Sequence, residues 1–289
     1  MEGSLVLSQI IGNAISIGAI YALLALGLTL LYSIMDILFF AHGAMYMLGA
    51  YAAFYLCTKL GLSYFLAIPL GVAIVGLLGV LLEKGLFRPI RDQHVSILFL
   101  AIGLNWFFES FGFAVFGLMP KPVKTIFPGQ VKVLGAILSW ERLAVVVISL
   151  AAVLGLYLFL TKTRWGLGMR AFAEDPVAAE LQGISNDTVC SLGFLVGCGL
   201  AALAGLLIAP IFIITPTMGS HAVLITMLII GLGGLGSLPG ALIAAFIIGT
   251  IESFGTSYLG ADITWGLTFI FVVIFLAIRP TGLLGMERE

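Results

Sequence analysis

Apolar stretches of about 20 residues recur along this chain, and they constrain its fold more than any other feature. A helix needs about 20 apolar residues to cross the hydrocarbon core of a bilayer. Of the 289 residues, 61% are hydrophobic and only 9% are charged, whereas soluble domains usually carry about 25% charged residues. The sequence therefore predicts an all-α fold, a polytopic transmembrane helix bundle that forms one domain over residues 1–289.

The apolar stretches predict about eight principal spans, whose ends are defined only to within a few residues. The seventh stretch is interrupted by the glycine-rich segment 231–240, so it could form one broken span or two helices. The expected spans are 9–34, 37–58, 62–83, 95–117, 142–161, 188–210, 221–258 and 262–279.

The basic residues indicate how the chain is oriented, because short loops rich in Lys and Arg stay in the cytoplasm. If the spans alternate, 8 of the 13 Lys and Arg residues fall on one side, in segments 84–91, 162–170 and 279–288. This bias predicts an external N-terminus and a cytoplasmic C-terminus. A loop at 118–141 would then face outward and a loop at 162–187 would face the cytoplasm.

The cytoplasmic loop contains the signals of one short helix. Asp175 followed by Pro176 is typical of a helix start, and Gly183 is typical of a helix end. A helix of about two turns is not stable alone in water, so it needs a surface to dock on, either a partner protein or the lipid headgroups. The apolar residues expected on its docking face are Val177, Ala178, Leu181 and Ile184.

Polar residues inside the spans are candidates for a solute path. Asn105 and Glu109 are four residues apart and share one helix face, and a carboxylate at this depth should face protein or water. They could line the path or hold helices together by hydrogen bonds. His42, near Tyr46, is more typical of a packed hydrogen-bonding residue than of a ligand, with a path role as the alternative.

The glycine-rich break at 231–236 also has two interpretations. Its GxGxxG pattern lacks the strand, helix and acidic residue of a dinucleotide site. Glycines let helices approach closely, and they can also leave backbone groups that line a cavity. The tentative path residues here are Gly233, Gly234 and Gly236.

The sequence lacks the motifs that several other functional classes require. The sequence has no GxxxxGK[ST] phosphate loop and no HExxH motif, no Cys/His ligand cluster, and no nucleophile motif. With a net charge of −1 it has no electrostatic footprint for nucleic acid. We expect no catalytic residue, no metal site and no bound cofactor. The charged residues around 83–92, including Glu83, Arg88, Arg91 and Asp92, are expected to form a solvated rim.

Five motifs occur in order along nearly the whole chain. They are FAHG with MLGAY (40–43, 47–51), RP (88–89), the segment 170–184, GGLGS with PGA (233–237, 239–241), and RPTGLLG (279–285). Together they resemble the permease subunits of branched-chain amino-acid ABC importers, the hydrophobic amino-acid uptake family. The resemblance implies a transport subunit for branched-chain or other small apolar amino acids in a prokaryotic plasma (inner) membrane. Urea or short amides as cargo, and an ion-driven carrier, are the alternatives.

The resemblance also implies a set of partners and a coupling site. The partners would be a second permease chain, identical or homologous, two cytoplasmic ATPase subunits that use ATP and Mg²⁺, an external solute-binding protein, and membrane lipid. The short helix would dock on the ATPase, and the loop at 83–92 could contact it as well. The implied coupling residues are Arg170, Glu174, Asp175, Val177, Ala178, Leu181, Gly183 and Ile184.

Overall fold

The computed structural model describes residues 2–91, 93–123, 129–133 and 136–285 of the chain. Within these residues, seven helices are long and apolar enough to cross a membrane, so the predicted polytopic helical bundle is confirmed. These helices are α1 (Glu2–Met35), α3 (Tyr64–Leu82), α4 (His94–Phe116), α5 (Trp140–Lys162), α8 (Asn186–Ile208), α10 (Leu238–Tyr258) and α11 (Ala261–Ile278).

Two of the expected spans take a different form. The stretch expected at 37–58 becomes α2 (His42–Ala53), which continues as the π-helix η1 (Phe54–Lys59). The interrupted stretch at 221–258 becomes two helices, the shorter α9 (Met218–Gly233) and α10. Ser237 starts α10 by accepting a hydrogen bond from the Gly240 backbone N–H at 3.2 Å.

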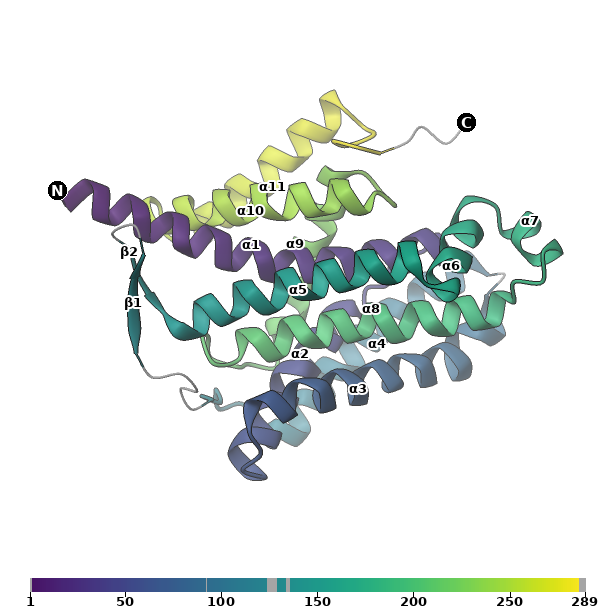
Figure 1. Cartoon of the computed structure of the whole chain (residues 1–289), viewed down its shortest axis with the longest axis horizontal. Helices are drawn as coiled ribbons and strands as arrows, with labels where there is room; N and C mark the ends of the chain where they lie inside the picture. The colour runs from purple at the N-terminus through teal and green to yellow at the C-terminus, as the bar shows by residue number, and fades with distance from the viewer. Residues whose placement is uncertain (1, 92, 124–128, 134–135, 286–289) are drawn as a thin grey trace.

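The long helices run along the longest axis of the molecule, and α9 crosses behind them (Figure 1). Of the seven long helices, α1 and α8 are the most buried and form the centre of the bundle together with α2, whereas α3, α4, α5 and α11 lie at its periphery. The peripheral helices expose large apolar side chains such as Leu77, Phe99, Leu154 and Phe271. Such a surface is stable only where lipid or another chain replaces water.

Small residues let the central helices approach closely. Gly205 of α8 packs against α2, where an added Cβ would lie only 2.0 Å from the carbonyl oxygen of Tyr46. Interfaces between membrane helices depend on such contacts because lipid removes the hydrophobic drive for helix association. Any side chain at Gly205 would therefore push α2 and α8 apart.

A β-hairpin lies between α4 and α5, which an all-α sequence pattern does not predict. Strands β1 (Gln130–Val133) and β2 (Ala136–Ser139) pair antiparallel, with Gln130 opposite Ser139. Residues 124–128 and 134–135 of the expected outer loop lie outside the described residues. The hairpin and the N-terminal end of α1 lie at one end of the long axis, opposite α7 (Figure 1).

Candidate functional site

The end of the molecule opposite the hairpin carries two short helices, α6 (Arg164–Glu174) and α7 (Pro176–Leu181) (Figure 1). Asp175 Oδ1 accepts a hydrogen bond from the Ala178 backbone N–H at 3.0 Å, which caps α7 at its start. Gly183 has a φ of +83°, the left-handed conformation that glycine favours at a helix end. The predicted start and end of this helix are therefore confirmed.

Three apolar side chains of α7 face away from the rest of the described protein. Val177 and Leu181 are 69% and 82% exposed, and Ala178 is also exposed. Ala179 is buried and attaches the helix to the bundle. Val177, Ala178 and Leu181 thus form an exposed apolar ridge, which we call the α7 ridge.

Ile184 does not belong to the α7 ridge, contrary to the prediction from helical spacing. It follows Gly183, where the left-handed backbone turns the chain back toward the bundle. Its backbone N–H donates to the Ala179 carbonyl at 3.1 Å, and its side chain is half-buried near Gly168 of α6. Arg170 and Glu174, the other predicted coupling residues, are exposed on α6.

A shallow hollow of about 380 Å³ lies beside α7, where the chain enters α8. Two carboxylates contribute to its wall, one from each helix. The lining residues are Glu180, Gly183, Ile184, Ser185, Asn186 and Asp187.

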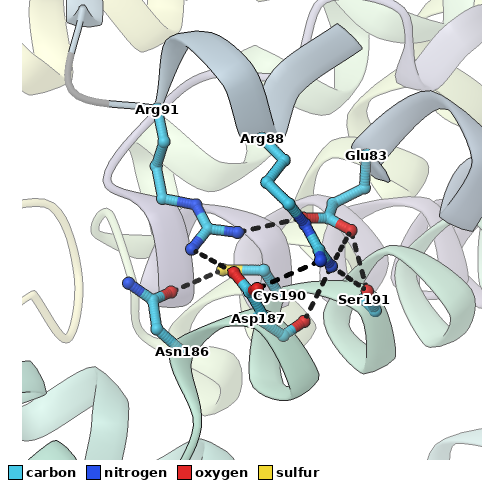
Figure 2. Close-up of polar contacts among 7 residues, drawn as sticks. All are labelled: Glu83, Arg88, Arg91, Asn186, Asp187, Cys190 and Ser191. Atoms are coloured by element: carbon cyan, nitrogen blue, oxygen red, sulfur yellow. Dashed lines mark hydrogen bonds and ion pairs between the residues drawn. The ribbon is translucent and has the colours of Figure 1, made fainter. Parts of the chain in front are cut away.

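Five residues next to this hollow form a charged cluster that joins α3 to α8 (Figure 2). Arg88 pairs with Glu83 and with Asp187, each at 3.0 Å. Arg91 pairs with the same two carboxylates, at 2.9 Å and 3.0 Å. Ser191 Oγ donates to Glu83 at 2.7 Å and accepts from Arg88 Nη2 at 3.0 Å. We call these five residues the ion-pair clamp.

The local backbone explains how both arginines reach Glu83. After α3 the chain continues as a π-helix, η2 (Glu83–Phe87), and then as a 3-10 turn, η3 (Arg88–Ile90). The change of helix type brings Arg88 and Arg91 back over Glu83. The Glu83 side chain is 0% exposed, whereas that of Asp187 is 53% exposed.

The expectation of a solvated charged rim is therefore wrong for Glu83, whereas Arg88 and Arg91 stay partly exposed. A carboxylate without solvent needs paired charges and hydrogen bonds, and two guanidinium groups supply them here. Asp92 lies outside the described residues. Asp187 was not predicted from the sequence as a member of this cluster. The available signal was Glu83, because an acidic residue at the end of an apolar span indicates a paired charge nearby.

Inside the bundle, Asn105 and Glu109 of α4 share one partner on α9. Asn105 Nδ2 donates to Ser220 Oγ at 3.1 Å, and Ser220 Oγ in turn donates to Glu109 Oε2. Asn105 is buried and Glu109 is half-buried. This arrangement supports the alternative in which the pair holds two helices together, and a role in a solute path stays a prediction.

His42 and Tyr46 of α2 are also buried in the bundle. His42 is 0% exposed, and its Nε2 lies 3.0 Å from the carbonyl oxygen of Leu24. A carbonyl can only accept, so Nε2 carries the proton and donates. The geometry fits the interpretation of His42 as a packed hydrogen-bonding residue.

The glycine-rich break forms a tight turn against the segment after α11. An added Cβ on Gly233 would meet the Ala241 backbone nitrogen at 2.6 Å, and one on Gly234 would meet the Gly285 nitrogen at 2.3 Å. The Leu284 N–H donates to the Gly233 carbonyl at 3.0 Å. Gly236 has a φ of +81° and less crowded surroundings. These contacts support close packing as the reason for the glycines.

Sequence reasoning missed a second acidic residue within a span, Glu252 of α10. Its Oε2 accepts a hydrogen bond from the Tyr21 hydroxyl of α1 at 2.5 Å. Helices α1 and α10 pack together along their length. A single glutamate in the apolar stretch 238–258 was the signal that could have found it.

The described part of the chain does not bring together side chains that could bind a metal ion. No group of three or more His, Cys, Asp or Glu residues there could hold a metal ion.

A bundle whose described part contains seven helices long and apolar enough to cross a membrane defines a multi-pass membrane protein. Residues 10–278 match the family described as "Branched-chain amino acid transport system / permease component", and the chain belongs to this family. The chain is thus a transport permease subunit.

Individual relatives agree with this assignment. The chain is 31% identical to the high-affinity branched-chain amino acid transport system permease protein BraD of Pseudomonas aeruginosa, over 94% of each chain. It is also 31% identical to the corresponding LivH protein of Escherichia coli K12, again over 94% of each chain. The solved structure of PsaBC from Streptococcus pneumoniae in complex with Fab shares the fold, with a TM-score of 0.53 and 13% identity over 94% of this chain and 92% of that one.

Proposed function

We propose that this chain moves branched-chain or other small apolar amino acids inward through a prokaryotic plasma membrane, powered by separate ATPase subunits. The chain pairs with a second permease chain, identical or homologous, and the solute path lies between the two. Two cytoplasmic ATPase subunits bind ATP and Mg²⁺, and an external binding protein delivers the solute. The N-terminus and the hairpin face outward, and α7 faces the cytoplasm.

The α7 ridge is the observation that carries this proposal. A helix of six residues cannot hold its shape in water by itself, yet Asp175 and Gly183 define both of its ends. Two large apolar side chains on it, Val177 and Leu181, are not covered by any described part of the chain. Because apolar surface is stabilised by removal from water, the ridge fits a groove in a partner, which we assign to the ATPase.

The names of the relatives support the solute class. BraD and LivH are described as permease proteins of branched-chain amino acid transport systems. Urea and short amides are the alternative cargo, which a ligand profile of the partner binding protein would identify.

The test of coupling is Leu181→Glu in the assembled complex, with Leu118→Glu as the matched control. Leu118 is 81% exposed and lies after α4 near the hairpin end, so it receives the same charge at equal exposure. We expect L181E to abolish solute-stimulated ATP hydrolysis and uptake, and L118E to preserve both. Membrane insertion, measured by the yield of purified chain, should be equal for the two.

Two results would reject this proposal. The first is full coupling in L181E. The second is solute uptake at the full rate by the purified chain in an ion gradient without any ATPase subunit, which would identify an ion-driven carrier.

A further inference from the structure

The ion-pair clamp lies at the place where α7 is joined to a membrane helix. Asp187 is in the first turn of α8, immediately after the short linker 182–185 that follows α7. Glu83, Arg88 and Arg91 all belong to the end of α3 and the turns η2 and η3. The linker thus joins α7 directly to the first turn of α8, and the clamp connects that turn to α3.

The clamp resists separation of these two helices at one end. Each arginine bridges Glu83 and Asp187, so pulling α8 away from α3 breaks the Arg88–Asp187 and Arg91–Asp187 pairs together. It also removes the hydrogen bond from Ser191 to Glu83. Glu83 keeps both arginines, which belong to its own segment, so opening costs the two pairs to the half-exposed Asp187 and the hydrogen bond from Ser191 to Glu83.

Below the clamp, the two helices are packed along their length. An added Cβ on Gly79 would lie 3.0 Å from the Phe194 carbonyl oxygen, and one on Gly76 would lie 3.0 Å from that of Leu195. At the far end, the Tyr64 hydroxyl donates to the Leu206 carbonyl at 2.8 Å. Packed interfaces of this kind favour discrete arrangements over continuous sliding.

We infer that the ion-pair clamp makes α3 and α8 one moving body, so that a displacement of α7 drives α3 together with α8. The clamp residues are positioning residues, because they act through the helices and do not touch the solute. This inference rests on the proposed function, in which α7 receives force from an ATPase. It adds that α3, which is remote from α7 in the sequence, belongs to the part that moves.

A disulfide between α3 and α8 tests the rigid-body part of the inference. An added Cβ at Gly199 would lie 3.4 Å from Val72 Cγ1, so cysteines at 72 and 199 are close enough to form a bridge. The double variant V72C/G199C would be made in a chain whose native cysteines, Cys57, Cys190 and Cys198, are replaced by alanine.

We expect the oxidised and reduced forms of V72C/G199C to transport solute at the same rate, because a bridge within one moving body changes nothing. Loss of uptake on oxidation, with recovery on reduction, would show that α3 and α8 move against each other and would overturn the inference. The comparison within one variant removes any effect of the substitutions on folding.

The role of the clamp itself is tested by Asp187→Asn. Asp262→Asn is the matched control, because Asp262 also lies in the first turn of a membrane helix and is exposed. We expect D187N to keep basal ATP hydrolysis but to lower the amount of solute moved per ATP by roughly fivefold. A purely structural role would lower the yield of complex and leave that ratio unchanged, and this result would overturn the inference.

The Arg91→Gln variant provides an independent check. Arg91 and Asp187 share one contact, so the double variant R91Q/D187N should lose less solute moved per ATP than the two single losses added together. Additive losses would mean that the two residues act separately and would contradict a clamp. If D187N has no effect while L181E still uncouples the complex, the inference fails and the proposed function stands. If L181E has no effect, the proposed function fails.

Discussion

Glu83 in the ion-pair clamp and Glu252 within α10 are both acidic side chains in apolar surroundings, but their partners differ. Glu83 has no exposed surface and contacts two guanidinium groups and a serine. Glu252 accepts hydrogen bonds from the side chains of Tyr21 and Trp265 and forms no ion pair with another described residue. Glu109, held by Ser220, resembles Glu252 in this respect.

The difference shows that one type of residue serves two purposes in this molecule. In the clamp the two carboxylates balance two arginines, and the strength of the contact depends on charge. In the membrane interior a hydroxyl donor needs only an acceptor atom, and the contact depends on hydrogen-bond geometry. Replacing the carboxyl group by an amide of the same shape therefore separates the two cases.

The largest effect is expected for Glu83→Gln. The amide keeps the shape of the side chain but removes the charge that two arginines face, and breaking a buried ion pair costs about 3–5 kcal/mol. We expect a clear fall in the thermal unfolding temperature of the purified chain and a loss of yield. Glu174→Gln, an exposed position on α6, is the control. Equal stability of E83Q and E174Q would show that the clamp is not held by charge.

A smaller effect is expected for Tyr21→Phe. Removing the hydroxyl takes away the donor on α1, whereas Glu252 keeps its side-chain hydrogen bond with Trp265, so we expect the loss of one hydrogen bond, about 0.5–1.5 kcal/mol. The thermal unfolding temperature of Y21F should lie between the temperatures of the wild type and E83Q. The companion variant Glu252→Gln keeps an acceptor for Tyr21 and should be more stable than Y21F. The reverse order would mean that charge matters at Glu252 as well.

The sequence predicted the bundle and α7 but neither member of this comparison, and the reason is physical. Apolar length predicted the bundle, and Asp175, Pro176 and Gly183 predicted α7 because helix ends depend on local chemistry. The clamp was missed because Asp187 is remote from Glu83 in the sequence and meets it only through α3–α8 packing. Ile184 was misplaced because helical spacing was continued past the glycine that ends the helix.

The smallest effect is expected for Glu109→Gln. The amide oxygen still accepts from Ser220, and Ser220 still accepts from Asn105, so we expect a change in stability of about 0.5 kcal/mol or less. Uptake by the assembled complex should also be unchanged, because the contact joins α4 to α9 without a need for charge. A loss of uptake at unchanged stability would assign the Glu109 charge to the solute path. It would also separate Glu109 from Glu252, and the two acidic residues of the membrane interior would no longer form one class.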